Sequence, residues 1–466
     1  MAFPPIDEIA HQVRSGQRSA RSFAQESLEL IASKNPQVNA FVALDPERSL
    51  AQASAVDELV AEGVDPGPLA GVPLGVKDLE DAVGFVTTEG SPLNEHAAAA
   101  LHDSLLVARL RRAGCVVIGK TNTPPYGWTA RTDNALFGLT RNPWNLDHHA
   151  GGSSGGSAAA VSSGMLPLAT ASDGGGSIRI PASICGLPGF KASFGRVPNG
   201  GAEAPGWLAL SSKGILARSV RETALATEII VGPDPSDLGS LPRPEASWLS
   251  AIEDPHTPAK VAWSPSLGYA EADREVLDAC LRALDLLEAS GVEVVEIKGP
   301  FDHDPVMEWL TIVNTCLARS TLDLREHPRY TELDQGLRNF IAMGDEVSGT
   351  QLVEALDASH HANLQLVELF SEFRLLISPT LASLPPAVAD GSEGMVNGQR
   401  SASWVGFTYP FNLTKSPAMS IPVGLSSSGL PIGMQLIGPQ HGDLVVLRAA
   451  AALEAMLQFK LTPEAR

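Results

Sequence analysis

Apolar positions recur along the chain at two spacings, which predict alternating helices and strands. Three- and four-residue spacing predicts amphipathic helices, and short apolar runs between Gly, Pro or polar residues predict buried strands. The expected helices cover residues 19–33, 45–62, 101–113, 154–164, 178–185, 272–289, 305–323, 350–371 and 443–457. The expected strands cover residues 72–76, 115–118, 166–170, 260–263, 292–297, 375–378, 419–423 and 433–437.

This alternation is typical of an α/β fold in which helices cover both faces of one central sheet. We predict a single large domain over residues 1–466, with a mixed, mostly parallel, twisted sheet and a core at residues 66–235. The helical stretch at about 300–372 interrupts the alternation and is interpreted as a helical cap inserted beside the sheet. Two stretches rich in Gly, Pro and Ser, 198–213 and 384–403, are expected to form long loops.

Composition narrows the class of protein. The net charge of −20 argues against nucleic acid as a ligand, because binding phosphates requires a basic surface. The four cysteines form no CxxC pair, so we expect no metal site and no cofactor. The N-terminus lacks the basic and apolar regions of a signal peptide, and no apolar run is long enough to span a membrane. We therefore expect a cytoplasmic enzyme with no membrane partner.

The segment Gly174-Gly175-Gly176-Ser177 has the residues of an acyl-transfer site. Consecutive glycines leave backbone N–H groups uncovered, so they can donate to one oxyanion next to a serine nucleophile. An ordinary helix start with a capping serine would give the same pattern. A second segment, Gly151 to Ser157, has P-loop-like glycines, but Ser157 stands where a P-loop has lysine.

Lys77 is the candidate base. It follows a buried strand, and burial lowers the pKa of a lysine because the charged form is poorly solvated. A neutral lysine can accept a proton. An ion pair with Asp78 or Glu80 is the alternative interpretation. His148 and His149 are interpreted as a polar turn before the glycine segment, not as a base.

These segments, together with several others, resemble the amidase signature family, whose members use a Ser–cis-Ser–Lys triad. The resemblance runs from about residue 25 to residue 457. Its motifs are Gly71 to Asp78, Ile118 to Asn122, Asn142 to Asn145, Gly151 to Pro198, Ser378 to Thr380, Asn412 to Thr414, Pro417-Ala418 and Gly429 to Gln435.

The resemblance implies roles for individual residues. Lys77 would be the base, Ser153 the bridging serine after a cis peptide bond, and Ser177 the nucleophile. The oxyanion hole would consist of the backbone N–H groups of Gly174, Gly175, Gly176 and Ser177. A proton would pass from Ser177 through Ser153 to Lys77, and later to the leaving amine, before water cleaves the acyl-enzyme.

The substrate is predicted from aromatic residues in expected loops, which indicate an apolar or aromatic ligand. The candidate substrate-binding residues are Tyr126, Trp128, Leu136, Phe137, Gly152, Trp207 and Leu208, with Trp309 and Trp404 as further candidates. We expect a monomer or homodimer that hydrolyses small aryl amides, and also aryl carbamates (urethanes) or esters. The alternative is a glutaminase-type subunit of a tRNA-dependent amidotransferase that acts with a partner protein. A non-catalytic binding protein is disfavoured because the triad is intact.

Overall fold

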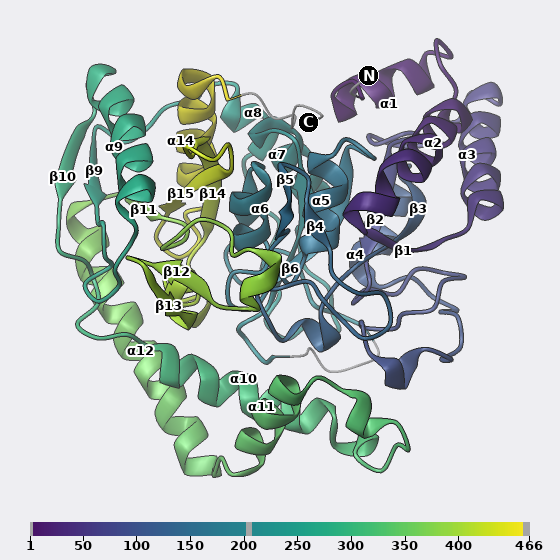
Figure 1. Cartoon of the computed structure of the whole chain (residues 1–466). Coiled ribbons are helices and arrows are strands. Elements are labelled where there is room, and N and C mark those ends of the chain that lie inside the picture. Colours follow the sequence, from purple (N-terminus) through teal and green to yellow (C-terminus); the bar gives the residue numbers. More distant parts are fainter. Residues whose placement is uncertain (1–2, 202–206, 460–466) are drawn as a thin grey trace.

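The computed structural model describes residues 3–201 and 207–459, built around one eleven-stranded sheet (Figure 1). The strand order is β1-β3-β2-β6-β8-β7-β14-β15-β11-β9-β10. The strands are β1 (Phe41–Leu44), β2 (Pro73–Lys77), β3 (Val116–Thr121), β6 (Leu168–Asp173), β7 (Gly189–Lys191), β8 (Ser212–Ala217), β9 (Lys260–Trp263), β10 (Glu293–Glu296), β11 (Leu376–Pro379), β14 (Ala418–Leu425) and β15 (Pro431–Ile437).

The sheet is mixed, and its two kinds of pairing are separated in space. Strands β3, β2 and β6 pair in parallel near one end, and strands β11, β9 and β10 pair in parallel at the other. From β6 to β11 the pairings are antiparallel, so parallel pairing extends less far than expected. One cause is that β14 and β15 are joined by a short turn, which permits only an antiparallel pair.

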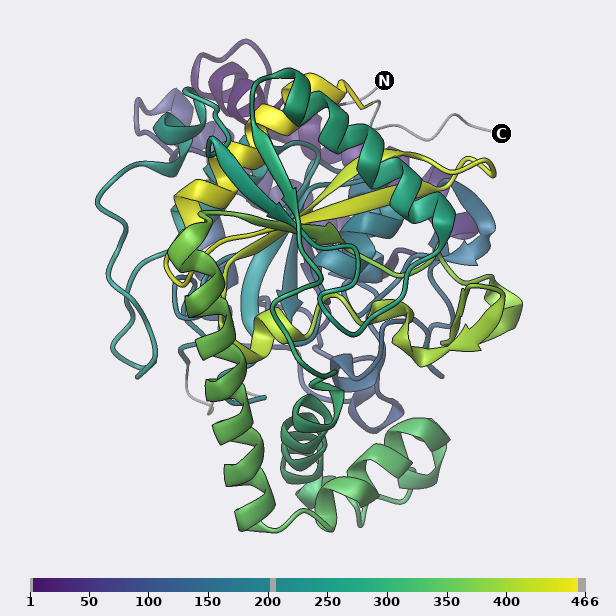
Figure 2. The same ribbon diagram turned by 90° about the vertical axis from the view of Figure 1, so that its left-hand side faces the viewer.

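Helices lie on both sides of the twisted sheet, as Figure 2 shows, which confirms the predicted α/β class with one mixed sheet. The helices outside residues 300–372 are α1 (Ile6–Arg14), α2 (Ala20–Val38), α3 (Pro46–Ala61), α4 (Leu105–Arg112), α5 (Gly155–Ser162), α6 (Arg179–Cys185), α7 (Val220–Ile230), α8 (Trp248–Ile252), α9 (Arg274–Ala289), α13 (Pro410–Leu413) and α14 (Asp443–Leu457). Every residue of α5 and α6 is buried. Small side chains allow these two helices to pack against each other inside the core.

Three further helices project from the body at the lower edge of Figure 1: α10 (Val306–Ser320), α11 (Gln335–Asp345) and α12 (Gly349–Glu372). Short 3₁₀ turns, η3 (Leu322–Leu324) and η4 (Tyr330–Glu332), connect α10 to α11. Apolar side chains of α10, α11 and α12 form a cluster that also includes Tyr126, Trp207 and Leu210. These helices therefore pack against loops of the sheet domain.

Both expected long loops contain regular structure. Strand β8 begins at Ser212, inside the stretch 198–213, because its backbone pairs with β6. Residues 202–206 of that stretch lie outside the described residues. The stretch 384–403 contains the hairpin of β12 (Gly394–Val396) and β13 (Gln399–Ser401), between the short turns η5 (Val388–Asp390) and η6 (Ala402–Val405). A smaller ribbon, β4 (Arg141–Asn142) with β5 (Asn145–His149), was also not predicted. Among the described residues, no helix has the length and apolarity needed to cross a membrane.

Candidate active site

Lys77 ends strand β2, and its side chain is completely buried. Its Nζ lies 2.9 Å from each of three hydroxyl oxygens, those of Ser153, Ser154 and Ser172. Burial lowers the pKa of Lys77 from 10.5 to about 7, although the negative charges of nearby Glu80 and Asp173 act in the opposite direction. A substantial fraction of Lys77 is therefore neutral at physiological pH.

The carboxylates that follow Lys77 in sequence are bound to other lysines. Asp78 Oδ1 lies 3.1 Å from Lys120 Nζ, and Glu80 Oε1 lies 2.6 Å from Lys213 Nζ. The alternative interpretation of Lys77, as the partner of Asp78 or Glu80 in an ion pair, therefore does not fit the geometry. Lys77 has only neutral oxygen atoms in hydrogen-bonding distance among the described residues.

Ser153 follows a cis peptide bond from Gly152. A Cβ atom on Gly152 would lie 2.7 Å from backbone atoms of Thr129, Ala130 and Arg131, so only glycine fits there. Gly152 is thus held against the neighbouring chain and directs Ser153 toward Lys77. The Ser153 side chain is almost fully buried.

Two more serines, Ser154 and Ser172, contact Lys77, and the sequence analysis did not identify them as its partners. Ser154 is the first residue before helix α5, but its side chain makes no capping hydrogen bond. Its hydroxyl instead lies beside Lys77 and donates to the backbone oxygen of Ser172 at 3.3 Å. The sequence signal that could have indicated these two contacts is that Ser154 follows Ser153 directly and that Ser172 precedes Asp173.

Ser177 lies in the loop between strand β6 and helix α6, and it is half-buried. The residue that precedes α6 is Ile178, so Ser177 does not cap the helix. Its backbone oxygen accepts a hydrogen bond from the Ser154 N–H at 3.3 Å, which brings the loop next to the Lys77 cluster. Ser177 is therefore a partly exposed loop residue and not an ordinary capping residue.

The backbone N–H groups of this loop have different partners. The Gly176 N–H donates to Asp173 Oδ1 at 2.7 Å and is therefore not available to an oxyanion. Within residues 3–201 and 207–459, the N–H groups of Gly174, Gly175 and Ser177 have no acceptor. The four donors expected from the sequence are therefore reduced to three.

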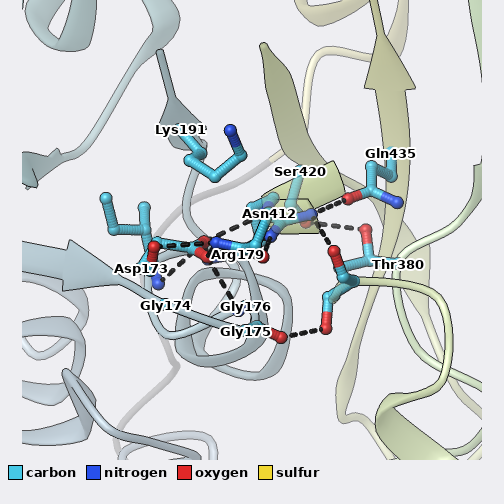
Figure 3. Close-up of polar contacts among 12 residues, drawn as sticks. Asp173, Gly174, Gly175, Gly176, Arg179, Lys191, Thr380, Asn412, Ser420 and Gln435 are labelled. Atoms are coloured by element: carbon cyan, nitrogen blue, oxygen red, sulfur yellow. Dashed lines mark hydrogen bonds and ion pairs between the residues drawn. The ribbon is translucent and has the colours of Figure 1, made fainter. Parts of the chain in front are cut away.

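An ion pair between Asp173 and Arg179 joins the two ends of the loop, as Figure 3 shows. Arg179 makes two hydrogen bonds of 2.9 Å to the carboxylate of Asp173, and both side chains are fully buried. Asn412 donates to Asp173 Oδ1 at 2.9 Å, and Arg179 donates to Gln435 Oε1 at 2.6 Å. Burial alone would raise the pKa of Asp173, but the charge and hydrogen bonds of Arg179 lower it to about 2. The pair therefore stays charged and fixes both ends of the loop.

Two tryptophans, Trp207 and Trp309, pack against the glycine loop. A Cβ atom on Gly174 would lie 2.6 Å from the ring of Trp207, and one on Gly175 would lie 2.4 Å from the ring of Trp309. The two indole rings meet edge to face, with centroids 6.4 Å apart. Of the candidate aromatic residues, these two contact the proposed oxyanion donors.

The remaining candidate pocket residues lie in several places. Tyr126 is buried in the apolar cluster with α10, α11 and α12, and its hydroxyl donates to Ser91. Trp128 packs against Phe340 of α11. Leu136 and Phe137 are half-buried in a turn held by Asn134, and Leu208 is 48% exposed. Trp404 is buried against His149, outside the aromatic contact at the glycine loop.

His148 and His149 are the last residues of strand β5 and do not form the turn that was predicted before the glycine segment. His149 is buried, and its Nδ1 accepts the Gly151 N–H at 3.0 Å. Burial lowers the pKa of His149 to about 3. Among the described residues, no group of His, Cys, Asp and Glu side chains is arranged to hold a metal ion.

Comparison with known proteins defines the class. The family model described as "Amidase" matches residues 23–447. An acylamidase of Rhodococcus erythropolis is 35% identical over 96% of this chain and 94% of its own length. A glutamyl-tRNA(Gln) amidotransferase subunit from Thiobacillus denitrificans is 32% identical over 97% of this chain and 96% of its own.

Solved structures agree with this assignment. A bacterial aryl acylamidase of the amidase signature family superimposes with a TM-score of 0.92, at 31% identity, covering 98% of this chain and 97% of that one. A 6-aminohexanoate cyclic dimer hydrolase in complex with its substrate gives a TM-score of 0.87 at 28% identity, with the same coverage. The fold and the matched sequence together define an amide-hydrolysing enzyme. The chain belongs to the amidase family.

Proposed function

We propose that the chain hydrolyses amides through an acyl-enzyme on Ser177, with Ser153 as the bridging group and Lys77 as the base. The observation that carries this proposal is the set of contacts at Lys77, a buried amine with three hydroxyl partners and, among the described residues, no carboxylate partner. Such an amine can lose its proton near neutral pH and then accept one.

Hydrogen-bond counting narrows the choice of the hydroxyl group that donates to Lys77. A neutral lysine has two N–H donors and one lone pair, so one of its three hydroxyl partners must donate to it. The Ser154 hydroxyl donates to the Ser172 backbone oxygen, so it accepts from Lys77. Counting leaves Ser153 and Ser172 as possible donors to the Lys77 lone pair. We assign this role, and that of accepting the Ser177 proton, to Ser153, because it follows the cis peptide bond and matches the bridging serine of the amidase signature family.

The reaction then follows in balanced steps. Ser177 Oγ attacks the carbonyl carbon while its proton moves to Ser153 and the Ser153 proton moves to Lys77. The N–H groups of Gly174, Gly175 and Ser177 are the available donors to the oxyanion. When the C–N bond breaks, protonated Lys77 returns the proton through Ser153 to the leaving nitrogen. Water then attacks the acyl-enzyme and releases the acid and Ser177.

The proposed substrates are aryl amides, and also aryl carbamates (urethanes) or esters. Trp207 and Trp309 lie against the loop that bears Ser177, so an aromatic group of the substrate can pack beside the reacting carbonyl. The similarity to an acylamidase and to an aryl acylamidase supports this choice. A cytoplasmic location and a monomeric or homodimeric state stay predictions from the sequence.

A glutaminase-type subunit is the second candidate, because glutamyl-tRNA(Gln) amidotransferase subunits match almost the whole chain. One experiment separates the two candidates. Wild-type protein and the Ser177→Ala variant are assayed with a nitroanilide, the matching aryl carbamate, an aliphatic amide and glutamine. We expect aryl turnover by the wild type and none by the variant. Turnover of glutamine alone would instead support the second candidate, and full activity of Ser177→Ala would contradict the proposed nucleophile.

A further inference from the structure

One side chain of the cap is hydrogen-bonded to the proposed oxyanion hole. The Trp309 Nε1–H, on helix α10, donates to the Gly174 backbone oxygen at 2.9 Å. That oxygen and the Gly175 N–H belong to the same peptide unit and point in opposite directions, because a trans peptide is planar. We propose that Trp309 is a positioning residue that keeps the Gly175 N–H directed at the substrate oxyanion. This inference rests on the proposed function.

Close packing supports this role. A Cβ atom on Gly175 would lie 2.4 Å from Trp309 Cζ2 and 3.1 Å from its Nε1, so the indole lies directly against this backbone. Gly175 is required there because any side chain would displace the ring and break the hydrogen bond. The identity of the glycine and the position of the tryptophan therefore depend on each other.

The next peptide unit, between Gly175 and Gly176, is hydrogen-bonded at both ends. Thr408 Oγ1 donates to the Gly175 oxygen at 2.6 Å, and the Gly176 N–H of the same unit donates to Asp173. That unit is fixed by the protein alone. The Gly174–Gly175 unit is held only at its carbonyl end among the described residues, which leaves its N–H for the substrate.

Trp309 is itself held from two sides. Its ring stacks on Tyr409 with centroids 5.6 Å apart, and it meets the Trp207 ring edge to face. The Tyr409 hydroxyl donates to Asp304 Oδ1 at 2.5 Å, just before helix α10 begins. The indole N–H therefore has a defined direction, and the cap determines the orientation of one oxyanion donor.

The test compares variants that remove the Trp309 indole N–H with a variant that removes an indole N–H outside the glycine loop. Trp309→Phe keeps an aromatic ring on Gly175, and replacement of Trp309 by 3-benzothienylalanine changes only N–H to sulfur. Trp144→Phe is the control, because the Trp144 Nε1–H donates to the Cys185 backbone oxygen at 2.8 Å, outside the glycine loop. The readouts are kcat and KM for a nitroanilide, affinity for an arylboronic acid that forms a tetrahedral adduct with Ser177, and the thermal midpoint.

Loss of a whole oxyanion donor lowers kcat by about 10²–10³-fold. When the donor is present but no longer held in place, kcat should decrease by less than when the donor is lost. We therefore expect both Trp309 variants to lose about 10-fold or more in kcat and in boronate affinity. KM should change little, because the ground-state carbonyl depends less on this donor. Trp144→Phe should keep wild-type kcat and boronate affinity.

The outcomes separate this inference from the proposed function. Full activity of Ser177→Ala would overturn the proposed function itself. If Ser177→Ala is inactive while the benzothienyl variant keeps wild-type kcat and boronate affinity, only the role of Trp309 is wrong. An increase in KM alone would also overturn it, because Trp309 would then only line the pocket.

Discussion

Two lysines, Lys77 and Lys120, lie on neighbouring strands and are both completely buried, yet their surroundings differ. Lys120 Nζ lies 3.1 Å from the carboxylate of Asp78 and donates to the Glu80 backbone oxygen at 2.7 Å. Within the part of the chain that the structure describes, Lys77 Nζ contacts three hydroxyl groups and no carboxylate. The same residue type is therefore an ion-pair partner on β3 and a candidate base on β2.

The different surroundings of Lys77 and Lys120 explain how two buried lysines can have different roles. A buried ammonium group is stable only when it is paired with a negative charge and hydrogen-bonded. Hydroxyl groups supply hydrogen bonds but no charge, so burial of Lys77 lowers its pKa to about 7. In this account Lys120 maintains structure, and Lys77 transfers protons.

The largest expected effect comes from removing the amine of Lys77. Lys77→Met keeps a side chain of similar length but cannot accept a proton, and loss of a general base costs about 10²–10⁴-fold in rate. We expect kcat for a nitroanilide to fall by that factor while the free energy of unfolding at pH 7 is not reduced. Retention of more than half of the wild-type kcat by a folded Lys77→Met would show that Lys77 is not the base.

The matched change at Lys120 should affect stability instead. Lys120→Met leaves the buried Asp78 carboxylate without its cation, and breaking a buried pair in this way costs about 3–5 kcal/mol. Denaturant unfolding of wild type and variant measures the loss. The Lys120→Met molecules that remain folded should hydrolyse substrate with the same pH dependence of the rate as the wild type. If stability is unchanged, Asp78 and Lys120 do not form the structural pair described above.

A smaller effect should follow from a change beside Lys77. Lys213 lowers the pKa of Lys77 through its positive charge, whereas Glu80, its partner in the ion pair, raises it. Lys213→Met removes the cation and leaves Glu80 uncompensated, so the pKa of Lys77 should rise. The acid limb of kcat/KM against pH then moves to higher pH, since more Lys77 is protonated at a given pH. Lys298→Met, at an exposed lysine, is the control and should leave the limb in place. A limb that stays or moves to lower pH in Lys213→Met would contradict this explanation.

Much of the fold could be predicted because its strands are short apolar runs between amphipathic helices. The alternation predicted an α/β sheet, and it predicted strands such as β3 and β9 at nearly the observed positions. Strand β8 was missed because it begins with Ser212, Lys213 and Gly214, which are polar or small. Its strand conformation comes from pairing with β6, a contact that local sequence does not show.

The site was predictable only where its residues are close in sequence or match family motifs. The glycine segments indicated Ser153 and Ser177. The residues that hold the loop, Thr408, Asn412 and Gln435, come from more than 200 positions farther along the chain, and only folding brings them to Asp173, Arg179 and Gly175. The occupied Gly176 N–H also follows from tertiary structure, because it depends on where the Asp173 side chain points.

The protonation state of Lys77 tests the central claim most directly. Protein labelled with ¹³C at lysine Cε is titrated by NMR, and the Lys77 signal is identified by its absence from Lys77→Met. Lys191 is also buried with a pKa lowered to about 7, so Lys191→Met is needed to separate the two signals. We predict a Lys77 midpoint at about 7, coinciding with the acid limb of kcat/KM. A Lys77 signal that stays in the ammonium form up to pH values near the ordinary lysine pKa, about 10.4, would contradict the account.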